Sequence, residues 1–194
     1  MIIPTNVNRT PEGSLSMDVF STLYNDRNVM LTEEITSGSV ASVIAQLITL
    51  DSKSHDPICL YINSPGGSVQ DGLALYDVMN SIESEVYTIG MGMIASMASV
   101  ILSAGTRGHR YLLPSSFTMI HEARNIPAQQ MTSLSEQKER MNVLEMFNQK
   151  TMEILAENCS KTLDELKKDS SYDHYFTADE AVTYGLADHV GLPD

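Results

Sequence analysis

The chain has 194 residues, of which 42% are hydrophobic, and it carries a formal net charge of −13 at pH 7. Such an acidic chain has few Lys and Arg side chains for phosphate contacts, which argues against a general nucleic-acid binder and against docking on anionic lipid. The length and hydrophobic content are typical of a single domain over residues 1–194 with a sizeable core.

The N-terminus and the cysteines indicate a cellular compartment. The first residues, MIIPTNVNRTPEGS, lack the basic start and the apolar stretch of a signal peptide. No uncharged run reaches the ~18–20 apolar residues of a membrane span. Cys59 and Cys159 have neither a CxxC pattern nor the Cys/His spacing of a metal site. We therefore expect a soluble cytoplasmic protein with no metal and with reduced, buried or half-buried thiols.

Strands and helices alternate along the chain. The apolar patterns predict helices at 18–24, 37–50 and 69–82, and strands at 29–31, 58–62, 86–91, 110–113 and 117–120. This alternation is typical of an α/β fold, in which βαβ crossovers build a largely parallel sheet.

The segment 128–158 does not fit a compact body. It contains no Gly or Pro and is rich in good helix formers. A helix of that length is about 45 Å long, whereas a compact domain of this size is roughly 40 Å across. Apolar residues recur along one side, so a protruding helix here indicates self-association. Two helices joined by an unmarked kink are the alternative.

Two glycine-bearing turns each follow a predicted strand and precede a helix. The first is YINSPGGSVQDG, residues 61–72, where Pro65 sets a turn and Gly66 and Gly67 allow backbone conformations that other residues avoid. Free N–H groups at such a turn can face an anion. By pattern alone, a Pro-Gly-Gly sequence is more often only a turn.

The second turn, IGMGMIASMAS, puts Ser96 between a strand and a helix. One interpretation is an N-cap, whose hydroxyl accepts a backbone N–H. The other is a nucleophile, placed where the helix dipole and the next N–H favour negative charge. The G-x-S-x-G pattern of α/β-hydrolases is absent. Ser99 and Ser103 lie further into the helix, and we expect them to pack and to bond carbonyls four residues earlier.

A serine nucleophile needs a base and a group that orients the base. His121 differs from the other four histidines because it ends the apolar strand FTMI, at the sheet edge where α/β folds often build sites. By pattern alone, a surface histidine is the simpler interpretation. Spacing does not choose the acid among several aspartates.

Four blocks of the sequence together resemble the ClpP family, the proteolytic subunits of ATP-dependent Clp proteases. The blocks are LYINSPGGSV, MGMIASMAS, LPSSFTMIHEA and YDHYFTADEAVTYGLAD, in the family's order and at its spacings. The resemblance implies an α/β fold of the ClpP/crotonase type, with an N-terminal axial segment at 1–17 and a protruding handle helix at 128–158. It also implies a serine endopeptidase that cleaves unfolded polypeptides through an acyl-enzyme.

The resemblance assigns roles to individual residues. It implies that Ser96 is the nucleophile, His121 the general base and acid, and Asp173 the orienting acid. Backbone N–H groups of Gly67 and Met97 would form the oxyanion hole. The pocket in which the family docks its unfoldase aligns with Tyr61, Ile89, Met91, Tyr111 and Leu113. No cofactor is implied for this chain, because the partner unfoldase uses the ATP.

The family assembles as heptameric rings stacked in pairs into a tetradecamer, and an AAA+ unfoldase of the ClpX, ClpA or ClpC type docks on the outside. Here the family's glycines after His121 are absent, and Pro127 lies where the family forms a strand. Tyr172 replaces an Arg that makes inter-ring ion pairs. These departures lead us to expect a divergent ClpP that acts with a second, more typical ClpP. A quiet structural subunit and a crotonase-type CoA-ester enzyme are the alternatives.

Overall fold

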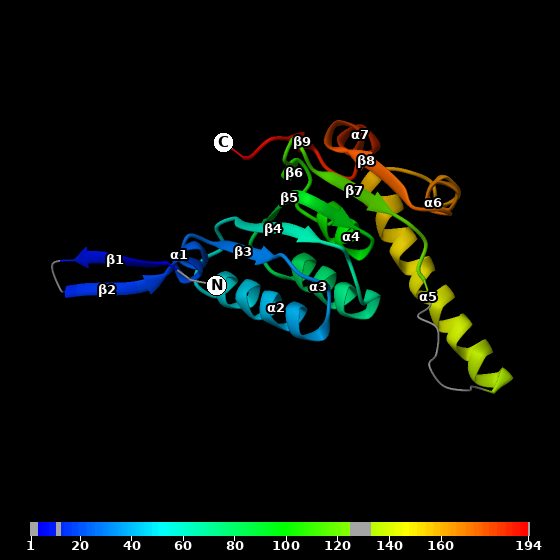
Figure 1. Cartoon of the computed structure of the whole chain (residues 1–194), viewed down its shortest axis with the longest axis horizontal. Coiled ribbons are helices and arrows are strands. Elements are labelled where there is room, and N and C mark those ends of the chain that lie inside the picture. Colours follow the sequence, from blue (N-terminus) through cyan, green and yellow to red (C-terminus); the bar gives the residue numbers. More distant parts are fainter. Residues whose placement is uncertain (1–3, 11–12, 125–132, 194) are drawn as a thin grey trace.

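The computed structural model describes residues 4–10, 13–124 and 133–193 of the chain (Figure 1). A parallel sheet forms the centre, a β-hairpin projects from one end, and a long helix projects from the other. The elements are β1 (Thr5–Thr10), β2 (Gly13–Asp18), α1 (Val19–Asn25), β3 (Asn28–Leu31), α2 (Ser37–Asp51), β4 (Ile58–Ser64), α3 (Val69–Ser81), β5 (Val86–Ala95), α4 (Met97–Ser103), β6 (Arg110–Leu112), β7 (Phe117–Ile120), α5 (Leu134–Cys159), α6 (Leu163–Asp169), β8 (His174–Thr177), α7 (Ala178–Tyr184) and β9 (His189–Val190).

The described part of the main sheet has the strand order β3-β4-β5-β6-β9, with β7 beside β5 and β8 beside β7. Every pair in this sheet is parallel except β7 with β8, which is antiparallel. Helical crossovers account for this arrangement, since parallel neighbours cannot be joined by a tight turn. The α/β class and the largely parallel sheet predicted from the sequence are confirmed.

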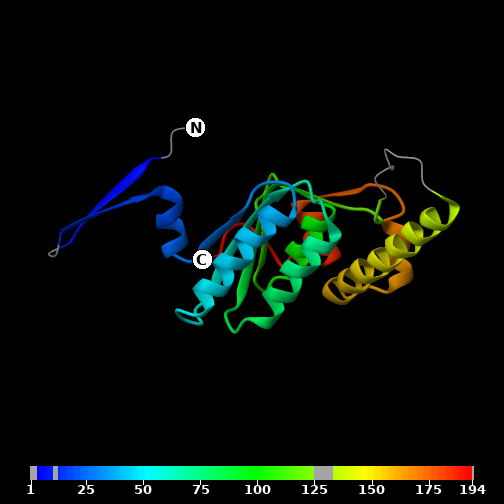
Figure 2. The same ribbon diagram turned by 90° about the horizontal axis from the view of Figure 1, so that it is seen from below.

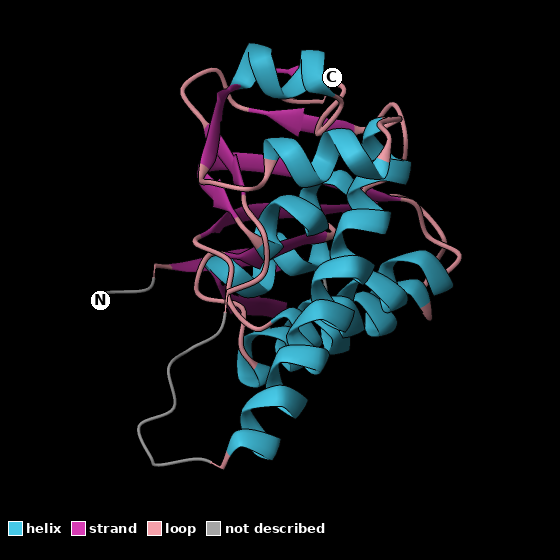
Figure 3. Ribbon diagram, turned by 90° about the vertical axis from the view of Figure 1, so that its right-hand side faces the viewer, coloured by secondary structure: helices cyan, strands magenta, loops and turns pink. Residues whose placement is uncertain are grey.

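Most of the helices lie on one side of the sheet (Figure 3). There α2 and α3 lie next to each other against the strands (Figure 2). The core between these layers contains Val43, Leu47, Leu50, Leu60, Ile62, Leu75 and Met79, all buried. Burying one such side chain stabilises a fold by about 1.5–3 kcal/mol. The helix α2 begins where predicted because Thr36 and Ser39 form a capping box.

Strand β5 continues to Ala95, beyond the predicted end at residue 91. The register against β4 shifts between Ile62 and Ser64, where a bulge interrupts the pairing. Gly92 adopts a φ of 72° there, and the N–H of Met93 donates to the side-chain oxygen of Asn63 at 3.2 Å. A glycine inside a strand is a weak signal that a bulge, and not an end, follows. The longer strand leads directly to Ser96.

The handle helix α5 is one continuous helix of 26 residues, about 39 Å long at 1.5 Å per residue. The alternative of two helices joined by a kink is wrong. The predicted start at residue 128 lies outside the described residues. Ser133 is extended and caps the helix with Glu136, so that α5 begins at Leu134. The C-terminal half is buried against the body, whereas Leu134, Met141 and Met146 are exposed.

The N-terminal segment is a hairpin in which β1 and β2 pair antiparallel, from Thr5 opposite Asp18 to Thr10 opposite Gly13. It extends away from the sheet (Figure 1). Asp18 closes the hairpin and caps α1, since its carboxylate accepts the Ser21 N–H at 2.9 Å. The axial role of residues 1–17 stays a prediction.

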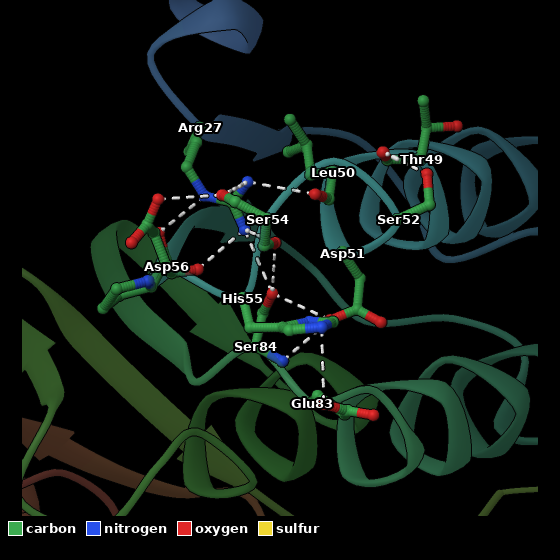
Figure 4. A network of polar contacts seen from close by, with 11 residues as sticks. Arg27, Thr49, Leu50, Asp51, Ser52, Ser54, His55, Asp56, Glu83 and Ser84 are labelled. Carbon is green, nitrogen blue, oxygen red and sulfur yellow. Dashed lines mark hydrogen bonds and ion pairs between the residues drawn. The ribbon is translucent and has the colours of Figure 1, made fainter.

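Arg27 fastens the loop after α2 to the beginning of β3 (Figure 4). Its guanidinium donates to the carbonyl oxygens of Leu50, Ser54, Asp56 and Pro57 and to the hydroxyl of Ser84. Arg27 also has a φ of 61°, a conformation that non-glycine residues seldom adopt. A planar fork with five donors suits this cluster of carbonyls, which a lysine could satisfy only in part.

Arg110 plays a similar part inside the other end of the body. It is 5% exposed and makes a two-pronged ion pair with Asp188, at 2.6 and 2.8 Å. Its remaining nitrogen donates to the carbonyl oxygens of Ser103, Asn158 and Gly185. These are the ends of α4, α5 and α7, so one buried cation satisfies three helix C-termini.

Within the described residues, no helix is both long and apolar enough to cross a bilayer.

Candidate active site

Ser96 lies at the junction of β5 and α4 with φ 57° and ψ −125°. A non-glycine residue in such a conformation costs of order 1–3 kcal/mol, and strain of this kind is typical of functional sites. Ser96 occupies the N-cap position of α4, but its side chain makes no capping hydrogen bond. The N-cap interpretation is therefore wrong, and the hydroxyl is free for another role. The Ser96 N–H donates to the Met119 carbonyl at 2.8 Å, which ties the junction to β7.

The other two serines of this segment are structural. The Ser99 hydroxyl lies 2.6 Å from the Met119 carbonyl and 3.0 Å from the Ile94 carbonyl. The Ser103 hydroxyl donates to the Val100 carbonyl at 2.8 Å. Both residues are buried, as expected. The prediction that each hydroxyl bonds the carbonyl four residues earlier is wrong. The acceptor lies five residues earlier for Ser99 and three residues earlier for Ser103.

The Pro-Gly-Gly turn packs directly on Ser96. A Cβ on Gly66 would lie 2.6 Å from the Ala95 carbonyl oxygen, so only glycine fits there. Gly67 has a φ of 146° and pairs as an isolated bridge with Ile35. Met97 is the first residue of α4, so its N–H has no partner within the helix. The structure thus brings the turn that bears Gly67 to the beginning of α4.

Ser96 and His121 line the same cavity, which has a volume of about 860 Å³. Gly67, Ser68, Val69, Ala123, Arg124, Leu144 and Phe147 also line this space. We call it the substrate cavity. A smaller recess of about 20 Å³ beside it is lined by both residues together with Met97 and Met152. Within the described residues, no hydrogen bond joins the Ser96 hydroxyl to the His121 ring.

Asp173 lies next to His121 because of the strand register. Ile120 pairs with His174 at the end of the antiparallel β7–β8 ladder, so His121 and Asp173 are the next residues beyond it. The Asp173 carboxylate, however, forms an ion pair with the Arg124 guanidinium. The Nδ1 atom of His121 is buried and has no hydrogen-bond partner among the described residues. His121 therefore lies near both Ser96 and Asp173, but no hydrogen bond within the described residues links the three side chains.

The surroundings of His121 favour its neutral form. Burial of the ring lowers the pKa of His121 below its ordinary value of 6.5, and the positive charge of Arg124 lowers it further. A polar contact with the Glu122 backbone and the negative charges of Asp173 and Glu122 act in the opposite direction and do not outweigh these effects. A histidine with such a pKa is an unprotonated base at pH 7.

The residues predicted for a docking pocket lie across adjacent strands. Tyr61 pairs with Ile89, and Ile89 pairs with Tyr111, so the three form one row across β4, β5 and β6. Met91 lies further along β5, and Leu113 follows β6 with its N–H on the Gly90 carbonyl. Ile89 is fully buried, whereas the two tyrosines are half-buried. The Tyr111 ring also contacts that of His189, at 5.3 Å between centroids.

The described residues contain no group of three or more His, Cys, Asp or Glu side chains placed to hold a metal ion. The two cysteines are free thiols, with Cys159 buried and Cys59 half-buried, as predicted. Burial raises the pKa of Cys159 to about 11, so this thiol is protonated at neutral pH.

Two residues of the site have roles that the sequence analysis did not predict. Gly66 supports Ser96, and Arg124 holds Asp173. The double glycine was a signal for the first. An arginine in the altered segment after His121 was the only signal for the second, and sequence spacing does not show which carboxylate an arginine will meet.

Comparison with known proteins identifies the family of the chain. A family model described as Clp protease matches residues 11–193. An ATP-dependent Clp protease proteolytic subunit from Ligilactobacillus salivarius (strain UCC118) is 40% identical over 191 residues, which cover 97% of this chain and 95% of that protein. The match over nearly the full length does not favour a crotonase-type enzyme or a quiet subunit. The chain belongs to the Clp protease family and is a serine-type endopeptidase.

Proposed function

We propose that Ser96, His121 and Asp173 are the catalytic triad with which this chain hydrolyses unfolded polypeptides inside a Clp protease. The observation that carries the proposal is the strained, uncapped Ser96, which lines one cavity with a neutral His121. The position of Asp173, one step beyond the β7–β8 ladder from His121, supports its role. The triad is identified by geometry and roles, since its chain order differs among unrelated proteases.

The reaction follows from these positions. The Ser96 hydroxyl attacks the scissile carbonyl while His121 takes the hydroxyl proton. The tetrahedral intermediate collapses to an acyl-enzyme when His121 returns the proton to the leaving amine. Water, activated by His121, then releases the second product. Asp173 orients the imidazole and stabilises the imidazolium that forms in both steps.

The backbone N–H groups of Gly67 and Met97 are the proposed oxyanion hole. The close packing of the Pro-Gly-Gly turn on Ser96 supports Gly67, and the helix N-terminus supports Met97. Donors at these places act on charge that develops only during the reaction. One such donor typically lowers a barrier by about 3–4 kcal/mol.

The substrate cavity supports peptide binding. Its apolar lining from Val69, Leu144 and Phe147 suits side chains of an extended polypeptide, while its volume exceeds that of a single side chain. Unfolded chains are therefore the proposed substrates, and no cofactor takes part in the proposed chemistry.

The exposed apolar part of α5 supports assembly. Leu134, Met141 and Met146 are exposed, and no residue in the described part of the chain covers them. Clp proteases are oligomers that work with unfoldases, and we propose the family's paired heptameric rings, with α5 as the contact between rings. The row from Tyr61 to Tyr111 is the proposed docking pocket for an unfoldase of the ClpX, ClpA or ClpC type, which supplies the ATP-driven unfolding. Cell fractionation would test the predicted cytoplasmic location.

A mixed complex with a second ClpP is the finer form of this proposal. The missing hydrogen bond between His121 and Asp173 supports it, because contacts from another subunit could move the two side chains into hydrogen-bond distance. A stable tetradecamer of this chain alone with full peptidase activity would contradict the need for a second subunit.

Labelling with a fluorophosphonate serine probe tests the proposed triad. We expect labelling of the wild-type chain, alone or mixed with a typical ClpP, and its loss in Ser96→Ala and His121→Ala. Ser99→Ala is the matched control, since Ser99 is buried and bonded to backbone carbonyls. Labelling that survives Ser96→Ala, or no labelling in any assembled complex, would overturn the proposal.

A further inference from the structure

The carboxylate of the proposed triad is occupied by a cation from the same chain. The Arg124 guanidinium pairs with Asp173, and Arg124 lies only three residues after His121. The side chains of Arg124 and Asp173 are 58% and 36% exposed. Water screens such a pair, and exposed ion pairs shift an equilibrium by no more than about fivefold. The pair is thus formed but easily exchanged.

The second observation concerns His121. In a closed triad the Nδ1–H of the histidine donates to the acid, which fixes the tautomer of the ring. Here Nδ1 of His121 is buried and has no hydrogen-bond partner among the described residues. A buried polar atom without a partner is uncommon and calls for an explanation. The acceptor that would satisfy it, Asp173, is the carboxylate that Arg124 holds.

The backbone between His121 and Arg124 is held by hydrogen bonds. The Glu122 N–H donates to the Ser170 carbonyl at 2.8 Å, and the Ala123 N–H donates to the side-chain oxygen of Asn148 at 2.9 Å. These bonds fix the segment against the end of α6 and the middle of α5. Exchange of the Asp173 carboxylate from Arg124 to His121 therefore needs side-chain rotation and no backbone rearrangement.

We propose that Arg124 is a positioning residue that competes with His121 for the carboxylate of Asp173 and holds the triad open in the resting subunit. This inference rests on the proposed roles of Ser96, His121 and Asp173. Arg124 itself contacts no reacting atom. Its effect is to keep His121 without its orienting acid, so that any contact that withdraws the guanidinium completes the triad.

The first test compares variants at one position. Arg124→Gln removes the charge and leaves a side chain of similar reach, while Arg124→Lys keeps the charge. Arg107→Gln is the control, because Arg107 is an exposed arginine that donates to the Glu157 carbonyl far from the site. We expect Arg124→Gln to be labelled by the fluorophosphonate about threefold to fivefold faster than the wild-type chain, because an exposed ion pair shifts the equilibrium by no more than about fivefold. Arg124→Lys, which keeps the competing charge, should gain less than Arg124→Gln, and Arg107→Gln should label at the wild-type rate. A rate for Arg124→Gln at or below that of the wild-type chain would overturn the inference.

A double-mutant cycle distinguishes competition from a simple charge effect. Asp173→Asn should slow labelling by a smaller factor when Arg124 is present, because Arg124 then holds most of the Asp173 carboxylate away from His121. In the Arg124→Gln background it should slow labelling at least about tenfold, since serine proteases lose up to about 10⁴ when this acid is replaced. Equal factors in the two backgrounds would show that Arg124 and His121 do not compete.

The same cycle can be followed without catalysis. The pKa of His121, measured by NMR with labelled histidine, should fall further on Asp173→Asn in the Arg124→Gln background than in the wild-type background. Additive shifts would overturn the inference even if labelling succeeds. If no variant is labelled, the proposed function fails, while a non-additive pKa cycle still supports the competition for Asp173.

Discussion

A Cβ atom on Gly66 would lie 2.7 Å from the Cβ of Ser96. The turn after β4 thus presses on the residue that begins α4, and the two proposed oxyanion donors flank this contact. The φ of Gly66 is 89°, so a side chain there is strained as well as obstructed. Contact between these two backbones, far apart in sequence, is what makes a site of two separate turns.

Replacing Gly66 tests this contact. We expect Gly66→Ala to displace the turn and to reduce serine-probe labelling by at least about tenfold, as loss of one oxyanion donor does. Gly108→Ala is the matched control, because Gly108 also has a positive φ, 85°, but nothing lies within 4 Å of its would-be Cβ. Labelling of Gly66→Ala at the rate of Gly108→Ala would contradict a role for the contact with Ser96.

The lowered pKa of His121 predicts the pH dependence of activity. Burial and Arg124 hold this pKa below 6.5, so the base should stay unprotonated until the pH falls below that value. The acid limb of kcat/KM for a small peptide should therefore have its midpoint below pH 6.5, and activity should be lost as pH falls through it. An acid limb above pH 6.5 in the wild-type chain would contradict the prediction.

Arg110 and Asp188 predict a stability effect. Burial raises the pKa of Asp188, but the hydrogen bonds and charge of Arg110 outweigh it and hold the pKa below the ordinary value. The stabilisation is therefore present above the unfolded pKa of about 3.9 and is lost as pH falls through the folded pKa. Asp188→Ala leaves a buried cation unpaired, and we expect a loss of about 3–5 kcal/mol in unfolding free energy. Urea denaturation measures this, with the exposed Asp77→Ala as control.

Replacing Arg27, at the other end of the body, should lower the free energy of unfolding by less than Asp188→Ala does. Arg27→Met keeps the aliphatic stem but leaves several loop carbonyls without their donor, and we expect a loss of about 1.5–3 kcal/mol. Many of these carbonyls are near water, which places the effect toward the lower value. Thermal denaturation of Arg27→Met beside Lys167→Met, an exposed lysine on α6, measures it. An unchanged midpoint for Arg27→Met would show that the network in Figure 4 adds no stability.

The thiols predict a ranking of reactivity. With a pKa of about 11, Cys159 is ionised to only about one part in a thousand at pH 8. It is also 6% exposed, whereas Cys59 is half-buried. Iodoacetamide should therefore modify Cys59 first, and Cys159 at a comparable rate only after unfolding, as mass spectrometry of digested samples would show. Faster modification of native Cys159 would contradict this burial.

The sequence by itself determined the order and type of the elements between residues 18 and 120, the presence of a long helix after them, and the residue types at the site. The N-terminal hairpin and the short elements after α5 were not predicted. Apolar periodicity is a local property, so strands such as 58–62 and helices such as 37–50 were predictable. The end of β5 was not, because a bulge held by Asn63 continues the strand past Gly92. The beginning of α5 depended on the cap at Ser133, which the uninterrupted run of helix formers concealed.

Only the tertiary structure decided which groups meet at the site. Strand register placed Asp173 beside His121, and the packing of Gly66 on Ser96 joined two turns. The tertiary structure also pairs the Asp173 carboxylate with the Arg124 guanidinium, and His121 Nδ1 has no hydrogen-bond partner among the described residues. The physical reason is that local sequence fixes backbone preference, whereas hydrogen bonds and ion pairs between distant residues depend on distances that only packing sets.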